Sequence, residues 1–144
     1  IMRDSRIGTY GVLALGLVMA AMGAAIADLG AEVPPVAFVA IAVASRCAML
    51  VVLVLLPPAR ADGLGAEAHA PGGRAVATGG AMTLVCLPPL GATALAVVAA
   101  MSAAAAALAM MARRRLGGQT GDVLGAVQLA SEAAGWLALS LTAI

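Results

Sequence analysis

The sequence predicts an all-α fold, a polytopic transmembrane helix bundle with about five spans. Of its 144 residues, 63% are hydrophobic and 10% are charged, and the mean hydropathy is +1.07. A soluble domain carries about a quarter charged residues, so this composition excludes an ordinary solvated surface. Long uncharged runs and an uneven placement of the arginines support the same fold class.

The uncharged runs define the spans expected in a single membrane-embedded domain, residues 1–144: about 10–27, 36–56, 75–90, 92–112 and 122–143. The first run has 18 residues, enough for one crossing at about 1.5 Å per residue. Residues 75–112 as one helix would be about 57 Å long, nearly twice the ~30 Å hydrocarbon core. The sequence PPLG at residues 88–91 therefore divides this run into two spans.

Arginine placement predicts the orientation of the bundle. With five spans, three segments face the same side, and they hold Arg3 and Arg6, Arg60 and Arg74, and Arg113, Arg114 and Arg115. The opposite side holds Asp28, Glu32 and no arginine. Positively charged loops favour the cytoplasmic side of a membrane, so we expect the arginine-bearing face to be cytoplasmic.

The densest polar segment, residues 113–126, reads RRRLGGQTGDVLGA. Three consecutive arginines alone are typical of a topology anchor that binds anionic lipid headgroups. The adjoining Gly117, Gly118 and Gly121 favour a phosphate site, because glycines let the backbone approach a ligand and amides at a helix start attract anions. We interpret this segment as half of an active site.

Two further residues of this segment have two interpretations each. Thr120 can cap the following helix through its hydroxyl, and Asp122 can stabilise the first turn of that helix. Either residue can instead contact a metal ion or a substrate. The sequence does not decide between these roles.

Two ionisable residues are expected near the middle of the bilayer, Arg46 in span two and Glu132 in span five. Glu132 lies about 15 Å along its helix from Asp122, on a narrow stripe of small and polar residues: Gly121, Gly125, Gln128, Glu132 and Gly135. Such a stripe faces a neighbouring helix rather than lipid. Arg46 and Glu132 form either an ion pair that joins two helices or part of a polar substrate cavity. Both alternatives predict contact between spans two and five.

The remaining residues indicate no further site. Cys47 and Cys86 lie in apolar runs, which indicates two small buried thiols rather than a disulfide or a metal site. His69 lies alone in a loop rich in Pro, Gly and Ala. One tryptophan, one tyrosine and one phenylalanine are too few for base stacking, so we expect no nucleic-acid partner.

Four motifs together resemble the cobalamin synthase family, adenosylcobinamide-GDP ribazoletransferase. They are IMRDSRIGTYGVLAL at the start, Ser45-Arg46, PPARADGLGA at residues 57–66, and RRRLGGQTGDVLGA followed by Glu132. The similarity covers nearly the whole chain in the family's order. The GGQTGD and DSRIGTYG segments are specific when they occur together.

The resemblance implies a multi-pass, Mg²⁺-dependent enzyme of the cell inner membrane. It would transfer the adenosylcobinamide phosphate group from adenosylcobinamide-GDP to α-ribazole or its 5′-phosphate, releasing GMP, in the last steps of cobalamin biosynthesis. Carried over by position, the catalytic residues are Asp122, Arg113, Arg114 and Arg115, and the metal ligands are Asp122 and Asp4. The substrate-binding residues are Arg6, Arg46, Arg60, Gly117, Gly118, Thr120, Gly121 and Glu132.

One departure from the family leaves alternatives open. Family members carry an aspartate-rich segment upstream of the position where this chain starts, so we expect this chain to lack part of the metal site. The alternatives are a catalytically incomplete fragment, a small non-enzymatic helical module, a transporter lined by Arg46 and Glu132, and a CDP-alcohol-type phosphotransferase. The aspartate motif of that last class is not found here. The lipid bilayer is the expected surrounding, and the oligomeric state is left open.

Overall fold

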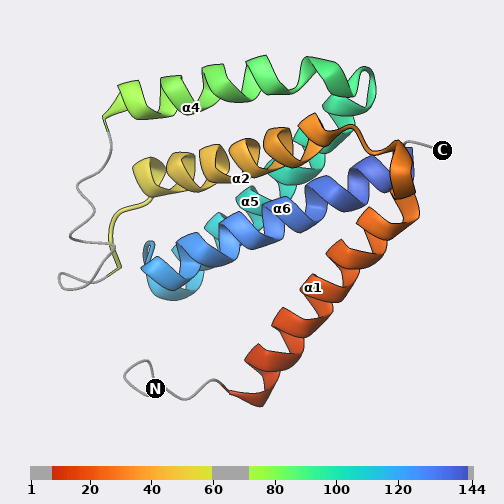
Figure 1. The fold of residues 1–144 in the computed structure, drawn as a ribbon. Coiled ribbons are helices and arrows are strands. Elements are labelled where there is room, and N and C mark those ends of the chain that lie inside the picture. Colours follow the sequence, from red (N-terminus) through yellow and green to blue (C-terminus); the bar gives the residue numbers. More distant parts are fainter. Residues whose placement is uncertain (1–7, 60–71, 143–144) are drawn as a thin grey trace.

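The structure, a computed structural model, describes residues 8–59 and 72–142, and every regular element in these ranges is a helix (Figure 1). The elements are α1 (Thr9–Leu29), η1 (Gly30–Glu32), α2 (Pro35–Leu55), α4 (Gly73–Cys86), η2 (Pro88–Leu90), α5 (Thr93–Leu116) and α6 (Gly121–Thr142). The prediction of an all-α fold is therefore confirmed.

Four of these helices, α1, α2, α5 and α6, are long and apolar enough to cross a membrane. They support a multi-pass membrane protein. The helix α4 has 14 residues, which extend over about 21 Å and fall short of a ~30 Å hydrocarbon core. A full crossing by the segment 75–90 therefore stays a prediction.

Prolines and glycines set the helix boundaries. α2 begins at Pro35, a first-turn position where the missing N–H of proline removes no helical hydrogen bond. Pro88 and Pro89 begin the short η2 helix, and Gly91 follows its last residue with a φ of 61°. Glycine adopts this conformation without steric strain. The long uncharged run is thus divided at the predicted place.

The helices α2, α5 and α6 form the packed part of the bundle. α5 and α6 contact each other most extensively, and α2 contacts both. Ile41, Met101 and Trp136 are buried there. Gly135 allows this close packing, because an added Cβ would lie 3.0 Å from Met101 Sδ and 3.1 Å from Ile41 Cγ2. This end of the predicted small-residue stripe therefore faces neighbouring helices.

The helix α1 contacts α6 over only part of its length. Figure 1 shows α1 diverging from the other helices toward its N-terminal end. Ala25 is buried, whereas Tyr10 and Leu17 are 89% and 70% exposed. Near the C-terminal end of α1, Ser140 Oγ donates a 2.6 Å hydrogen bond to Asp28 Oδ2. This bond fastens α1 to α6 at one end only.

Candidate phosphate-binding site at the α5–α6 turn

The α5–α6 turn (residues 117–120) lies at the end of the bundle where α2 also ends (Figure 1). Gly117 follows α5 in a left-handed conformation, with φ 77° and ψ −4°, as glycines at helix C-termini commonly do. Thr120 precedes α6, and its Oγ1 accepts a 3.3 Å hydrogen bond from Val123 N. The capping role of Thr120 is therefore confirmed.

Residues 57–59, which follow α2, pair with this turn. Gln119 N donates to Pro57 O, and Ala59 N donates to Gln119 O, both at 2.8 Å. Gly118 is buried beside this pairing, and a Cβ there would lie 2.2 Å from Pro57 O. Glycine is thus required at this position, because the backbone of residues 57–59 leaves no room for a side chain. The expected role of Gly118 in ligand binding stays a prediction.

The three arginines form the last turn of α5, rather than a loop between spans. The negative end of the helix dipole favours cations at this position. All three side chains are exposed. They point in different directions about the helix axis, because consecutive residues of a helix are about 100° apart. Arg115 lines an apolar hollow of about 200 Å³ with Val123 and Ala126 of α6. Arg113 and Arg114 leave the helix in other directions.

Asp122 lies in the first turn of α6 with an exposed side chain. Within residues 8–59 and 72–142, no group of three or more His, Cys, Asp or Glu could hold a metal ion. Mg²⁺ is often bound through only one or two carboxylates, with phosphates and waters completing its octahedron. Asp122 suits one place in such a set. Asp4, Arg6 and Arg60 lie outside the described residues.

The turn therefore gathers three chemical features around one loop. They are exposed guanidinium groups, the N–H groups of a helix start and one carboxylate. Guanidinium groups and helix N-termini both bind phosphate oxygens. This combination suits a phosphate ester held together with a divalent cation.

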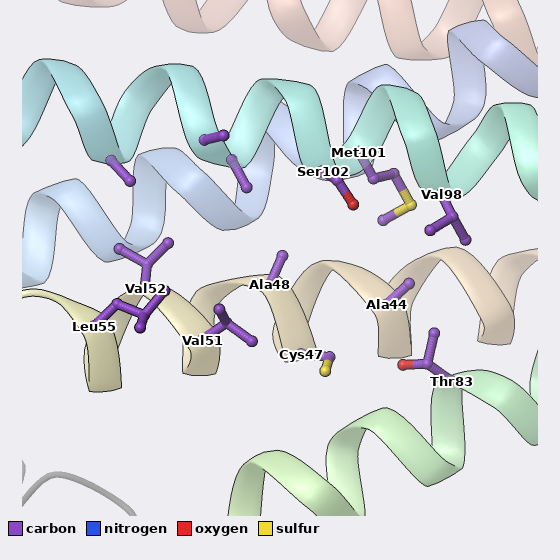
Figure 2. Close-up of a pocket in the computed structure, with 13 residues that line it drawn as sticks. Ala44, Cys47, Ala48, Val51, Val52, Leu55, Thr83, Val98, Met101 and Ser102 are labelled. Atoms are coloured by element: carbon purple, nitrogen blue, oxygen red, sulfur yellow. The ribbon is translucent and has the colours of Figure 1, made fainter.

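A second feature, an apolar groove of about 320 Å³, lies between α2, α4 and α5. Figure 2 shows its lining by Val51 and Leu55 of α2 and by Val98 and Met101 of α5. Cys47 also lines this groove, and both cysteines of the chain are free thiols. The groove contains no charged residue, so it does not provide a phosphate site.

Of the two alternatives for Arg46 and Glu132, the ion pair is wrong, and a shared polar substrate cavity stays a prediction. Glu132 Oε2 instead accepts hydrogen bonds from Ser45 Oγ at 3.2 Å and from Gln128 Nε2 at 3.0 Å. Arg46 is exposed, and its Nη1 donates to Ala42 O of the same helix at 2.9 Å. The physical reason is helix rotation: Ser45 faces α6, and Arg46 points about 100° away from it. Contact between spans two and five is nevertheless confirmed.

Ser45 and residues 57–59 have roles that the sequence analysis did not assign. Ser45 is fully buried, and its single hydroxyl proton is shared between Glu132 Oε2 and Ala42 O, which lies 3.0 Å from Oγ. Ser45 directly precedes Arg46 and therefore lies at nearly the same depth in the membrane. The sequence position of Ser45 alone thus makes it a second possible partner of Glu132. The pairing of residues 57–59 uses backbone atoms, which no side-chain pattern indicates.

The model of the cobalamin-5-phosphate synthase family matches residues 1–140. This chain belongs to that family. A curated adenosylcobinamide-GDP ribazoletransferase from Bradyrhizobium diazoefficiens is 45% identical to this chain over 135 residues. The one from Azorhizobium caulinodans is 43% identical to it over 144 residues. The relative from Rhizobium etli is 41% identical over 150 residues.

The match to this cobalamin-5-phosphate synthase family confirms the resemblance drawn from the motifs. The three alignments cover 92%, 93% and 97% of this chain, and 52%, 54% and 58% of the relatives. The chain thus spans about half the length of the curated relatives it matches. No solved structure matches the chain.

Proposed function

We propose that this chain carries the phosphate-binding part of an adenosylcobinamide-GDP ribazoletransferase. The observation that carries the proposal is the α5–α6 turn, where the RRRLGGQTGD segment is fixed against residues 57–59. The enzyme would move the adenosylcobinamide phosphate group from adenosylcobinamide-GDP to α-ribazole or its 5′-phosphate. Charged nucleotide substrates suit a site at the water boundary, on the cytoplasmic face of the inner membrane.

The reaction is a phosphoryl-type transfer between two oxygens. A ribose hydroxyl of α-ribazole attacks the phosphorus that bears the cobinamide group. The bond from this phosphorus to the bridging oxygen breaks, GMP leaves with that oxygen, and the hydroxyl proton passes to water. In such transfers the protein contributes mainly by positioning the reactants and by neutralising charge.

The described residues fit these two tasks. Arg113 and Arg114 can bind the phosphate oxygens, and the N–H groups at the start of α6 can donate further hydrogen bonds. Asp122 would hold Mg²⁺ together with substrate phosphates and an acidic residue outside the described ranges, such as Asp4. The bound ion would neutralise the diphosphate.

The test uses the chain in lipid nanodiscs with adenosylcobinamide-GDP, α-ribazole and a series of Mg²⁺ concentrations. GMP release is measured. We expect Asp122→Asn to need more Mg²⁺ and to lower turnover by roughly 10²-fold. Arg74→Gln, at the start of α4 and outside the α5–α6 turn, is the matched charge control. Unchanged turnover of Asp122→Asn at saturating Mg²⁺ would remove Asp122 from the mechanism.

A catalytically incomplete chain is the second candidate. It is favoured by the alignments, which cover about half of the relatives. This candidate predicts binding of adenosylcobinamide-GDP without GMP release. Equilibrium binding to the same nanodiscs, weakened by Arg114→Gln but not by Arg74→Gln, would support it if turnover is absent. GMP release by the unmodified chain would exclude it.

A further inference from the structure

Arg46 places an exposed charge in the middle of an apolar helix. It lies eleven residues after Pro35 and nine before Leu55, so each end of α2 is about 14–16 Å away along the axis. Among the residues that the structure describes, Arg46 has no ion pair, and its Nη1 bonds to Ala42 O. A guanidinium group at bilayer mid-depth is unfavourable against lipid tails, which offer neither water nor a counter-charge.

The side of α6 next to Arg46 is also uncovered and polar. Ser45, which precedes Arg46, touches Glu132, and both Gln128 and Glu132 are only half-buried. Gly125 lies two turns from Glu132 on the same stripe, and a Cβ added there would meet nothing within 4 Å. Figure 1 shows why: α5 lies behind α2 and α6, and α1 diverges from α6. We name this surface the α2–α6 flank (Arg46, Gly125, Gln128 and Glu132).

We propose that the α2–α6 flank docks a further transmembrane helix that presents a carboxylate at the depth of Arg46. Arg46 selects the acid, because an unpaired guanidinium in a membrane is stabilised by an opposite charge. The carboxylate of Glu132 on the same flank is already hydrogen-bonded to Ser45 and Gln128 and does not pair with Arg46. Gly125 provides the space that close helix packing in membranes requires. The curated relatives exceed the aligned region by nearly its own length, which is ample for further spans of about 20 residues. This inference does not depend on the proposed reaction.

The test uses a synthetic helix as the probe. Two 23-residue Leu/Ala peptides are compared in nanodiscs that contain the chain, one with a central Glu and one with a central Leu. Energy transfer from a donor at the protein C-terminus to an acceptor on the peptide reports association. We expect the acidic peptide to bind about five- to thirtyfold more tightly, the range measured for polar contacts between model membrane helices. The preference should disappear in Arg46→Gln and remain in Arg74→Gln.

A second variant separates docking from misfolding. Gly125→Leu fills the open space on α6 without changing any charge, so we expect it to weaken binding of both peptides while circular dichroism stays unchanged. Equal binding of the two peptides to the unmodified chain would overturn the proposal. An acid preference that survives in Arg46→Gln would do the same.

Two other occupants give different results. Energy transfer between two labelled copies without peptide, lost in Glu132→Gln, would assign the flank to a second copy and overturn the proposal. A charged thiol reagent reports access to the flank in Gln128→Cys, which keeps Arg46 and is made with Cys47→Ala and Cys86→Ala. Protection of this thiol by the acidic peptide supports docking, and unchanged reactivity contradicts it.

Discussion

Gly118 is the residue at which the α5–α6 turn should tolerate least change. A Cβ there would lie 2.2 Å from Pro57 O and 3.0 Å from Ala59 N, and both are backbone atoms that cannot rotate away. We expect Gly118→Ala to break the pairing of Gln119 with residues 57–59 and to lower the free energy of unfolding by about 2–4 kcal/mol. Circular dichroism of the unfolding of the detergent-solubilised chain measures this change.

Gly125→Ala is the control for this substitution. Its added methyl group meets no atom within 4 Å, and alanine is favoured over glycine inside a helix by about 0.5–1 kcal/mol. We therefore expect unchanged or slightly higher stability. If Gly118→Ala were as stable as Gly125→Ala, the backbone pairing would contribute little to holding the two segments together.

At the scale of the helices, the mid-depth hydrogen bond between α2 and α6 depends on one carboxylate. Glu132→Ala removes an acceptor from the Ser45 hydroxyl and from Gln128, so we expect a loss of about 1–2 kcal/mol in the free energy of unfolding. Glu132→Gln keeps an acceptor oxygen and the side-chain shape, and should lose less than about 0.6 kcal/mol. Unfolding in a detergent titration measures both variants.

A double-mutant cycle isolates the bond between the helices. Ser45→Ala and Glu132→Ala are made singly and together, and their coupling energy is the departure from additivity. We expect the double variant to lose less than the sum of the two single losses. Strict additivity would show that the Ser45–Glu132 bond does not contribute to the contact of α2 with α6.

The helix positions follow from the sequence because apolar runs and their proline and glycine breaks act locally. Pro35 starts α2 and the segment at Pro88 divides the long run, as the composition predicts. The partner of Glu132 could not be fixed in this way. Residue counting gives the depth of Arg46, but the rotation of α2 about its axis decides whether residue 45 or 46 faces α6, and neighbouring helices set that rotation.

The sequence also does not predict the length of α4 or the divergence of α1 from the other helices. α4 ends at Cys86, before the prolines, although the uncharged run continues. Nothing in the apolar run of α1 distinguishes its packed end from its exposed end, because lipid and protein interiors both favour the same residues. Of the site, the sequence predicted the polar cluster and gave capping as one of two roles for Thr120, while the backbone pairing with residues 57–59 is a property of the folded chain.

At the scale of the whole molecule, the chain reversals divide the bundle into two unlike ends. α2 and α5 end near the place where α4 and α6 begin, and the arginines of residues 113–115 lie there (Figure 1). η1 and η2 lie at the opposite end, where Asp28 of α1 binds Ser140. The proposed function requires the arginine-bearing end to face the cytoplasm, where soluble nucleotides are found.

Thiol labelling of intact cells tests this orientation. Arg114→Cys and Ala31→Cys are each made with Cys47→Ala and Cys86→Ala, and treated with a membrane-impermeant maleimide. Because arginine-rich segments favour the cytoplasmic side, we expect the thiol at residue 31 to react from outside. The thiol at residue 114 should react only after permeabilisation. Labelling of residue 114 from outside would separate the α5–α6 turn from the cytoplasmic nucleotides, and the proposed function would then have no substrate at its site.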